Sequence, residues 1–303
     1  MVWDTCSVDL HGGSNGFYFT NNIITGSVVL EFKQERKIEQ IDLKVTGISK
    51  ATWSRSSPTL PYIKIYSQKK RVLDISIADV FKELQGKTIK PGIRSYQFHF
   101  MLQADLPPTF KDSIAKIYYR IAIQSKNTCK IKKKQYFPFN VMNYLNLNHV
   151  SEFKIPMVYV LEKKFGNTAD FSVTFKTYRG FASTQQIPFE VIITNVKRVK
   201  VRKICVTLIQ KIEYNVNSGY YNNEKNICKT EYNEILNLAK QTCMFSMEIP
   251  QVIIPSTINQ VEPMVDISYS LQVKVSFQFH LPLYSDIPVT IASTPVTHGI
   301  FYK

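Results

Sequence analysis

The amino-acid sequence predicts an all-β protein made of two antiparallel, immunoglobulin-like β-sandwich domains in tandem. Apolar and polar residues alternate with a period of two in many short segments, while helical patterns are scarce. Of the 303 residues 44% are hydrophobic, including 19 Phe and 17 Tyr. That is enough apolar material for real cores, and it excludes an intrinsically disordered chain. Because a domain usually holds roughly 100–200 residues, we expect two domains.

The longest alternating segment covers residues 268–279 and predicts a strand with one buried face. Its apolar residues are Tyr269, Leu271, Val273, Val275, Phe277 and Phe279. The same pattern recurs more briefly at residues 96–102, 117–123, 171–175 and 204–208. Many short, half-buried strands separated by Pro and Asn turns are typical of antiparallel β-sandwiches.

Two segments have the spacing of a helix. In residues 77–84 the apolar side chains fall at i, i+3, i+4 and i+7, which predicts two helical turns, and residues 233–239 are a weaker candidate. Neither could cover a parallel sheet, so the sheets should be antiparallel. The Asn-rich stretch 143–155 interrupts the alternation between two halves of nearly equal length. We therefore expect one sandwich in residues 1–148 and the other in residues 149–303.

The sequence lacks targeting signals. Asp4 and Asp9 stand where a signal peptide would be basic, and no stretch reaches 18 consecutive apolar residues. The five cysteines are odd in number and include no CxxC, which favours free thiols in a reducing compartment. We expect a cytoplasmic protein, with peripheral contact at the plasma membrane or at endosomes.

Enzymatic signatures are also missing. The sequence contains no GxSxG, HExxH, GxxxxGK or GxGxxG motif, and its five histidines have no Cys or carboxylate at metal-ligand spacing. Residues 11–16 are glycine-rich like a phosphate loop, but they lack the Lys and the following helix, so we interpret them as a turn. We expect no catalytic residue, no metal and no cofactor.

Basic residues give the one compositional signal of function, because 38 Lys and Arg against 23 Asp and Glu leave a formal charge of +15. Two clusters supply candidate contacts to phosphate groups or an anionic membrane. The first contains Lys130, Lys132, Lys133 and Lys134, and the second contains Lys197, Arg198, Lys200, Arg202 and Lys203. The first should lie at a hairpin tip between two strands, with a merely solvated turn as the alternative. In the second, apolar residues change parity near 202–203, which predicts strand-end charges that protect a sheet edge.

Nucleic-acid binding is a remote alternative for so basic a chain. The aromatic residues fall on the apolar parity, whereas a surface that stacks bases would place them among the basic residues. No RNP, KH or zinc-binding pattern is present. We therefore expect no nucleic-acid partner.

Several segments, taken in order, resemble those of arrestin domain-containing proteins, the α-arrestin family. In the first half these are YFTNNIITGSVVL at 18–30, LKVTGISKATW at 43–53, IKPGIRSYQFHF at 89–100, LPPTFKD at 106–112 and IYYRI at 117–121. In the second half they are RGFA at 179–182, IPFEVIITN at 187–195, IPQVIIPS at 249–256, ISYSLQV at 267–273 and IPVTIASTP at 287–295. Asn21 and Asn22 stand where the family has Gly-Asp, and Asn tolerates the left-handed conformation of such a turn.

The resemblance implies an arrestin fold and a non-enzymatic cytosolic adaptor that binds cytoplasmic parts of membrane proteins in protein transport, endocytosis and sorting. Family members connect such cargo to ubiquitin ligases through PPxY motifs in a C-terminal tail, which bind WW domains. This sequence contains no PPxY and ends at Lys303. We therefore expect a form without that tail and leave a ligase partner open. The alternative is a tail-less scaffold that binds other arrestins or sorting proteins.

Overall fold

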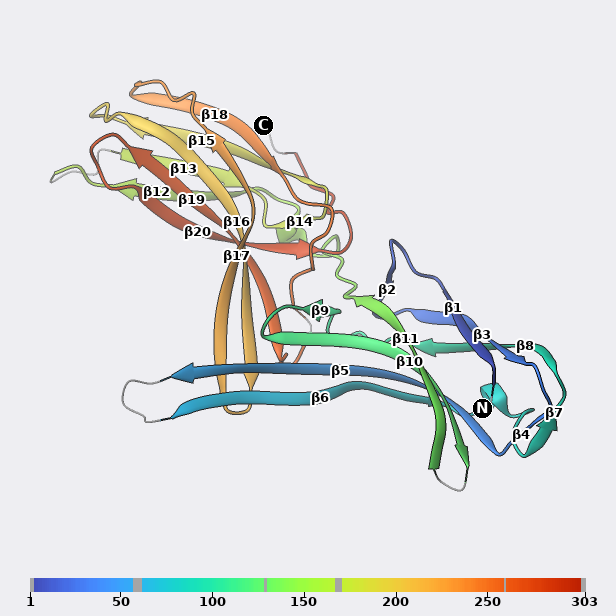
Figure 1. Ribbon diagram of the computed structural model, residues 1–303. Coiled ribbons are helices and arrows are strands. Elements are labelled where there is room, and N and C mark those ends of the chain that lie inside the picture. Colours follow the sequence, from blue (N-terminus) through green and yellow to red (C-terminus); the bar gives the residue numbers. More distant parts are fainter. Residues whose placement is uncertain (1–2, 57–61, 128–129, 167–170, 259, 301–303) are drawn as a thin grey trace. The chain divides into compact units, whose positions relative to one another are not determined.

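The structure is a computed structural model that describes residues 3–56, 62–127, 130–166, 171–258 and 260–300 (Figure 1). It contains strands β1 to β20 and two 3₁₀ turns, η1 (Asp79–Phe81) and η2 (Ser151–Phe153), with no α-helix in the described residues. The predicted all-β class is confirmed, and nearly all strand pairs are antiparallel.

The chain forms two compact units that do not coincide with its two halves. Unit 1 comprises Met1–Tyr144, Tyr214–Tyr220 and Asn259–Val265, and unit 2 comprises Leu145–Glu213, Tyr221–Ile258 and Asp266–Lys303. The expected division between residues 148 and 149 remains a prediction.

Unit 1 is a sandwich of two facing sheets. One sheet has the order β1-β3-β8, and the larger follows the path β2-β11-β10-β5-β6 with β9 paired to β10, while β4 and β7 form a small ribbon. The strands are β1 Thr5–His11, β2 Phe17–Phe19, β3 Ile23–Phe32, β4 Arg36–Ile38, β5 Gln40–Ser56, β6 Ile63–Ile77, β7 Lys87–Ile89, β8 Gly92–Met101, β9 Phe110–Lys111, β10 Ala115–Asn127 and β11 Lys130–Met142. The sheets meet where the ring of Phe139 on β11 lies 6.0 Å from that of Phe100 on β8.

The register of β10 follows the predicted alternation. Ile117, Tyr119, Ile121 and Ile123 are all buried as predicted; among their even-numbered neighbours Tyr118 and Arg120 are half-buried, while Ala122 and Gln124 are buried as well. Burying one such isoleucine side chain stabilises the fold by about 1.5–3 kcal/mol. Both tryptophans of the chain, Trp3 and Trp53, are also buried in unit 1.

Unit 2 repeats the arrangement with one four-stranded and one five-stranded sheet, ordered β12-β13-β15-β18 and β14-β20-β19-β16-β17. The strands are β12 Met157–Lys163, β13 Phe171–Thr177, β14 Gly180–Ala182, β15 Gln186–Asn195, β16 Val201–Val216, β17 Gly219–Tyr232, β18 Lys240–Glu248, β19 Val265–Phe277 and β20 Leu283–Ala292. The end of β16 from Tyr214, the start of β17 up to Tyr220 and Val265 of β19 are assigned to unit 1. The sheets face one another across Phe171 on β13 and Phe277 on β19, whose ring centroids are 4.8 Å apart.

The predicted register of residues 268–279 is correct except at its end. The side chains of Tyr269, Leu271, Val273, Val275 and Phe277 are buried as expected. Strand β19 ends at Phe277, however, and Phe279 is 90% exposed with a φ of 65°. A positive φ takes the backbone out of the extended region, so the alternation cannot continue to that residue.

The predicted helices are wrong. Ile77 ends β6, and the rest of residues 77–84 forms only the 3₁₀ turn η1, although Phe81 and Leu84 are buried as their spacing required. Two helical turns form too few hydrogen bonds to offset the cost of helix nucleation. Residues 233–239 are irregular. The left-handed conformation expected at the first turn is present, with a φ of 63° at Asn21.

The described cysteines are free thiols, and burial raises the pKa of Cys6 to about 12 and that of Cys228 to about 11. Such thiols are poor nucleophiles at neutral pH because little thiolate is present.

No helix in the described ranges is long and apolar enough to cross a bilayer.

Candidate functional site: the basic clusters

The first basic cluster lies on strand β11, not in a loop between strands. The β10–β11 ladder continues to the pair Asn127–Lys130, so both strands extend beyond Gln124 and Gln135, where the sequence had placed their ends. The predicted hairpin is present, but its strand ends were placed wrongly, because successive lysines hide the alternation that marks a strand. The side chains of Lys130 and Lys132 lie outside the described residues.

Lys133 supports the start of the chain. Its ammonium group donates a hydrogen bond to the carbonyl of Trp3 at 2.5 Å and lies 5.0 Å from the centre of the indole ring. Gln135, two residues along the same face, accepts a hydrogen bond from the Trp3 indole at 3.5 Å and donates one to the Cys6 carbonyl at 3.1 Å. Lys133 and Gln135 therefore hold the N-terminal segment against β11.

Lys134 points to the opposite, outer face, because successive strand residues alternate. Its ammonium group is 5.1 Å from the centre of the Tyr136 ring, and the guanidinium of Arg120 is 3.9 Å from that ring. The Arg120 Nε also donates to the Thr46 hydroxyl at 3.4 Å. Two cations and an aromatic ring thus share the outer face beside β11; we call Arg120, Lys134 and Tyr136 the hairpin face.

Two aromatic residues lie on the outer face of the sheet, beside the cations of the hairpin face. Tyr118 and Tyr136 lie on the outer face among basic side chains, contrary to the sequence expectation that aromatic residues occupy only the apolar parity. Arg120 lies against both rings, at 5.7 Å and 3.9 Å from their centres. Cation–π contacts of this kind occupy ring faces that a base would need for stacking.

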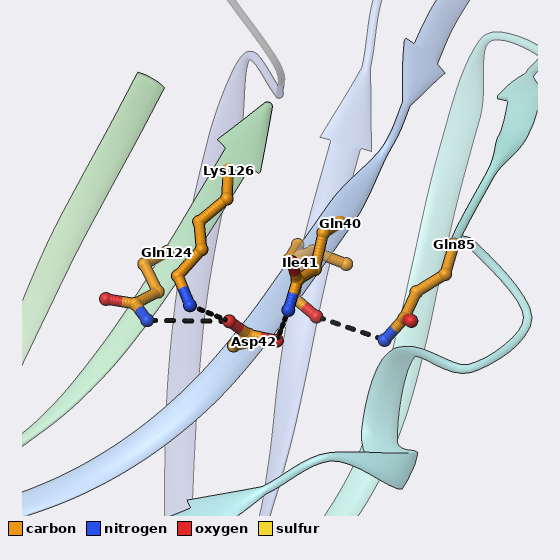
Figure 2. A network of polar contacts seen from close by, with 6 residues as sticks. All are labelled: Gln40, Ile41, Asp42, Gln85, Gln124 and Lys126. Atoms are coloured by element: carbon orange, nitrogen blue, oxygen red, sulfur yellow. Dashed lines mark hydrogen bonds and ion pairs between the residues drawn. The ribbon is translucent and has the colours of Figure 1, made fainter. Parts of the chain in front are cut away.

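Asp42 is a buried carboxylate within a network of polar contacts that includes Gln124 and Lys126 of β10 (Figure 2). Asp42 on β5 is 7% exposed, and its Oδ2 is 3.0 Å from the Nζ of Lys126. The side-chain amides of Gln40 and Gln124 donate to Asp42 at 3.0 and 3.5 Å, and Gln85 donates to the neighbouring Ile41 carbonyl. Burial alone would raise the pKa of Asp42, but the hydrogen bonds from Lys126 and Gln40 and the Lys126 charge outweigh it, so the pKa is lowered. The Lys126 charge is consequently neutralised within the fold.

We expect the Asp42→Asn variant to be less stable than the parent by about 1–3 kcal/mol at pH 7, because it loses charge-assisted hydrogen bonds. Since the folded pKa lies below the unfolded one, the stabilisation is complete above the unfolded pKa and is lost as the pH falls through the folded pKa. The difference in the free energy of unfolding between the parent and the Asp42→Asn variant should therefore shrink below about pH 4. Urea unfolding across acidic pH measures it.

Asp74→Asn is the matched control, because the Asp74 carboxylate pairs with Arg71 on the exposed surface. Exposed pairs contribute about 0–1 kcal/mol. If the free energies of unfolding of the Asp42→Asn variant and the parent differed by the same amount at every pH, the lowered pKa of Asp42 would be contradicted.

The second basic cluster surrounds the start of β16, and several of its residues are engaged in the fold. Lys197 donates to the Phe165 carbonyl at 2.5 Å, and Lys203 pairs with Glu231 at 2.8 Å. Hydrogen bonds from Lys203 and then Lys229 lower the pKa of Glu231 to about 2.

The remaining members lie at the turn before β16 and on its first residues. Arg198 has a φ of 51°, Lys200 accepts a backbone hydrogen bond from Gln278, and Arg202 is exposed. Strand β16 starts at Val201, close to the start that the parity change predicted. The cluster belongs to unit 2 and the first cluster to unit 1. Contacts of either cluster to phosphate or membrane remain predictions.

Other segments singled out in the sequence have structural roles. Residues 11–16 form a turn with positive φ at Gly12, Asn15 and Gly16. The Asp112 carboxylate accepts hydrogen bonds from the backbone of Ile114 and Ala115. In the part of the chain that the structure describes, no three His, Cys, Asp or Glu side chains are grouped so as to hold a metal ion.

The chain thus belongs to the class of all-β proteins with two β-sandwich units, and each unit carries one of the two basic clusters. The profile of the arrestin (or S-antigen) N-terminal domain matches residues 6–148, and that of the arrestin C-terminal domain matches residues 168–296. The chain therefore belongs to the family of arrestin domain-containing proteins. Domains of this family are non-catalytic adaptors that generally bind membrane receptors and trafficking factors, which is consistent with a protein that is not an enzyme.

Two curated relatives agree with this assignment. The chain is 23% identical over 204 residues to arrestin domain-containing protein C31A2.12 of Schizosaccharomyces pombe, a match that covers 65% of this chain and 33% of the relative. It is 26% identical over 141 residues to arrestin domain-containing protein 1 of Rattus norvegicus, covering 44% of this chain and 32% of the relative. The matches thus span about a third of either relative's length.

Proposed function

We propose that this chain is a cytosolic adaptor of the arrestin type, which binds acidic or phosphorylated cytoplasmic segments of membrane proteins during endocytosis and sorting. The observation that carries the proposal is the succession of an arrestin N-terminal and an arrestin C-terminal domain along the chain. The net charge of +15 supports an anionic partner. Peripheral contact with the plasma membrane or endosomes follows from the same charge.

The hairpin face is the surface that we assign to the anionic segment. Lys134 and Arg120 lie together on the outer face and form no ion pair in the residues described, whereas Lys126 is neutralised by Asp42. The planar guanidinium of Arg120 suits bidentate contact with a phosphate or carboxylate. Lys132 and Lys130 precede Lys134 on β11, where the pairing with β10 shifts register between Ser125 and Lys126. Near an anionic membrane each such cation contributes about 1 kcal/mol.

We expect the double variant Lys132→Glu/Lys134→Glu to bind a phosphorylated tail peptide and phosphatidylserine vesicles at least about tenfold more weakly than the parent, a loss of about 1.4 kcal/mol. Stability should stay nearly unchanged, since Lys134 is exposed. Binding by the parent should weaken as the Debye length shortens from about 10 Å at 0.1 M salt to about 3 Å at 1 M. Fluorescence anisotropy and vesicle sedimentation measure these affinities.

The control makes the same charge change elsewhere, in Lys37→Glu/Lys87→Glu on the β4–β7 ribbon, and should bind like the parent. Lys133 is left out because its reversal would break the contact with Trp3 and lower stability. Equal affinities of parent and Lys132→Glu/Lys134→Glu would show that these lysines are solvated charges that bind no anionic segment. The exposed Arg202 and its neighbours would then be the next surface to test.

A scaffold is the second candidate, because residues 1–303 contain no PPxY motif that could bind a WW domain. Such a scaffold would bind other arrestins or sorting proteins and recruit no ubiquitin ligase. Affinity purification at low salt followed by mass spectrometry separates the candidates. Membrane cargo with a ligase favours a ligase-coupled adaptor, sorting subunits without a ligase favour the scaffold, and bound RNA or DNA favours the nucleic-acid alternative.

A further inference from the structure

Four lysines lie side by side in a line that crosses four strands of unit 1. Lys116 on β10 is directly opposite Lys50 on β5 and directly opposite Lys111 on β9, while Lys50 is directly opposite Lys69 on β6. We call these four residues the lysine row. Because neighbouring strands are about 4.8 Å apart, the row is about 14 Å long.

All four side chains belong to the outer face of the sheet. Ile117 and Tyr119 on β10 are buried on the inner face, so Lys116 has the outward parity, and residues opposite one another across strands share a face. The other three lysines of the row are exposed. The Lys116 ammonium group lies 5.1 Å from the centre of the Tyr118 ring.

The lysine row lacks a neutralising partner. None of the four forms an ion pair in the described ranges of the chain. The adjacent carboxylate of Asp112 accepts hydrogen bonds from the backbone of Ile114 and Ala115 and from the Tyr214 hydroxyl. Like charges directly opposite one another destabilise a sheet, so the row opposes folding unless an anion is bound.

A cavity accompanies the row at the β9–β10 turn. Its volume is about 250 Å³, and three of the four lysines line it, namely Lys50, Lys111 and Lys116. The hydroxyl-bearing residues Thr52 and Ser113 also line it, as does Asp112, whose carboxylate already accepts hydrogen bonds from within the fold. Ammonium and hydroxyl groups around one cavity are donors that suit a phosphate-bearing ligand.

We propose that the lysine row and its cavity bind a compact ligand that carries several phosphate groups. The charges of the row are spaced by about 4.8 Å across the strands, whereas side chains on one side of an extended peptide recur only about every 6.7 Å. Three lysines meet at one cavity, which favours clustered phosphates over a long chain. A phosphorylated inositol headgroup of a lipid and a free polyphosphate share this chemistry. The row differs from the hairpin face in its residues but adjoins it, because Lys116 of the row and Arg120 of the hairpin face both lie near the Tyr118 ring.

The test compares the full chain with the variant Lys50→Gln/Lys116→Gln in calorimetric titrations with tripolyphosphate and with soluble inositol trisphosphate. We expect the variant to bind at least tenfold more weakly and to be no less stable than the parent. The matched control Lys37→Gln/Lys87→Gln removes two charges from the β4–β7 ribbon of the same unit, away from both basic surfaces, and should retain the parent's affinity. Equal losses of affinity in both variants would show that binding depends only on the net charge of the protein, and would overturn the proposal.

Vesicle flotation distinguishes the two sources of the ligand. Phosphatidylcholine vesicles with and without phosphatidylinositol bisphosphate are mixed with the parent and with Lys50→Gln/Lys116→Gln. Flotation that needs the phosphorylated lipid and is lost in the variant supports a headgroup, and binding of soluble probes without flotation supports a free polyphosphate. If the parent binds neither, or binds only a doubly phosphorylated peptide, the proposal is wrong.

Discussion

Replacing Phe277 with alanine should lower the free energy of unfolding by about 3–5 kcal/mol. The ring is 5% exposed at the end of β19, and its centroid lies 4.8 Å from that of Phe171 and 5.3 Å from that of Phe165. Its removal leaves a cavity between the two sheets of unit 2, and the surrounding rings can fill it only partly. Urea unfolding followed by circular dichroism measures the loss.

Phe279→Ala is the matched control, only two residues further along. Phe279 is 90% exposed, so its truncation should change stability by no more than about 0.5 kcal/mol. Similar losses for the two variants would show that β19 does not end at Phe277 and would contradict the register of unit 2.

The Gly47→Ala variant should be destabilised by about 1–3 kcal/mol through overpacking. A Cβ atom at this position of β5 would lie 2.5 Å from Cε1 of Tyr119 and 3.0 Å from Cβ of Leu73. The Tyr119 ring cannot easily move away, since it is buried and its hydroxyl donates to the Pro107 carbonyl at 2.5 Å. Urea unfolding of the single variants measures each change in stability.

A double variant provides the control for this clash. Tyr119→Leu removes the ring, so Gly47→Ala should cost much less in that background than in the parent. If Gly47→Ala leaves stability unchanged, or if the stability losses of Gly47→Ala and Tyr119→Leu simply add in the double variant, the strand shifts to accept the methyl group.

The sandwich cores were predictable because burial imposes a period of two on each strand. Ile121 on β10 and Val273 on β19 are buried on the parity that the alternation of apolar residues predicted. Phe279 and residues 77–84 were mispredicted because the pattern of apolar residues records which side chains need burial, not the local backbone conformation. Phe81 is buried as its spacing required, although its backbone forms a 3₁₀ turn.

The basic surfaces were only partly predictable. Composition indicated an anionic partner, and the clusters at Lys130 and Lys197 were visible as runs of charge. The lysine row was not visible, because its members lie far apart in sequence and are joined only by the register of β5, β6, β9 and β10. Register depends on which strands pair, and no local sequence pattern states that. The contact of Lys133 with Trp3 was hidden for the same reason.

The location of both tryptophans has a practical consequence. Trp3 and Trp53 are buried in unit 1, and unit 2 contains no tryptophan. Intrinsic emission excited at the indole band therefore reports on unit 1 alone, while a backbone signal reports on both units. Two spectroscopic traces from one unlabelled sample can follow the units separately. Any difference between their transition midpoints would show directly that the units do not unfold as one cooperative body.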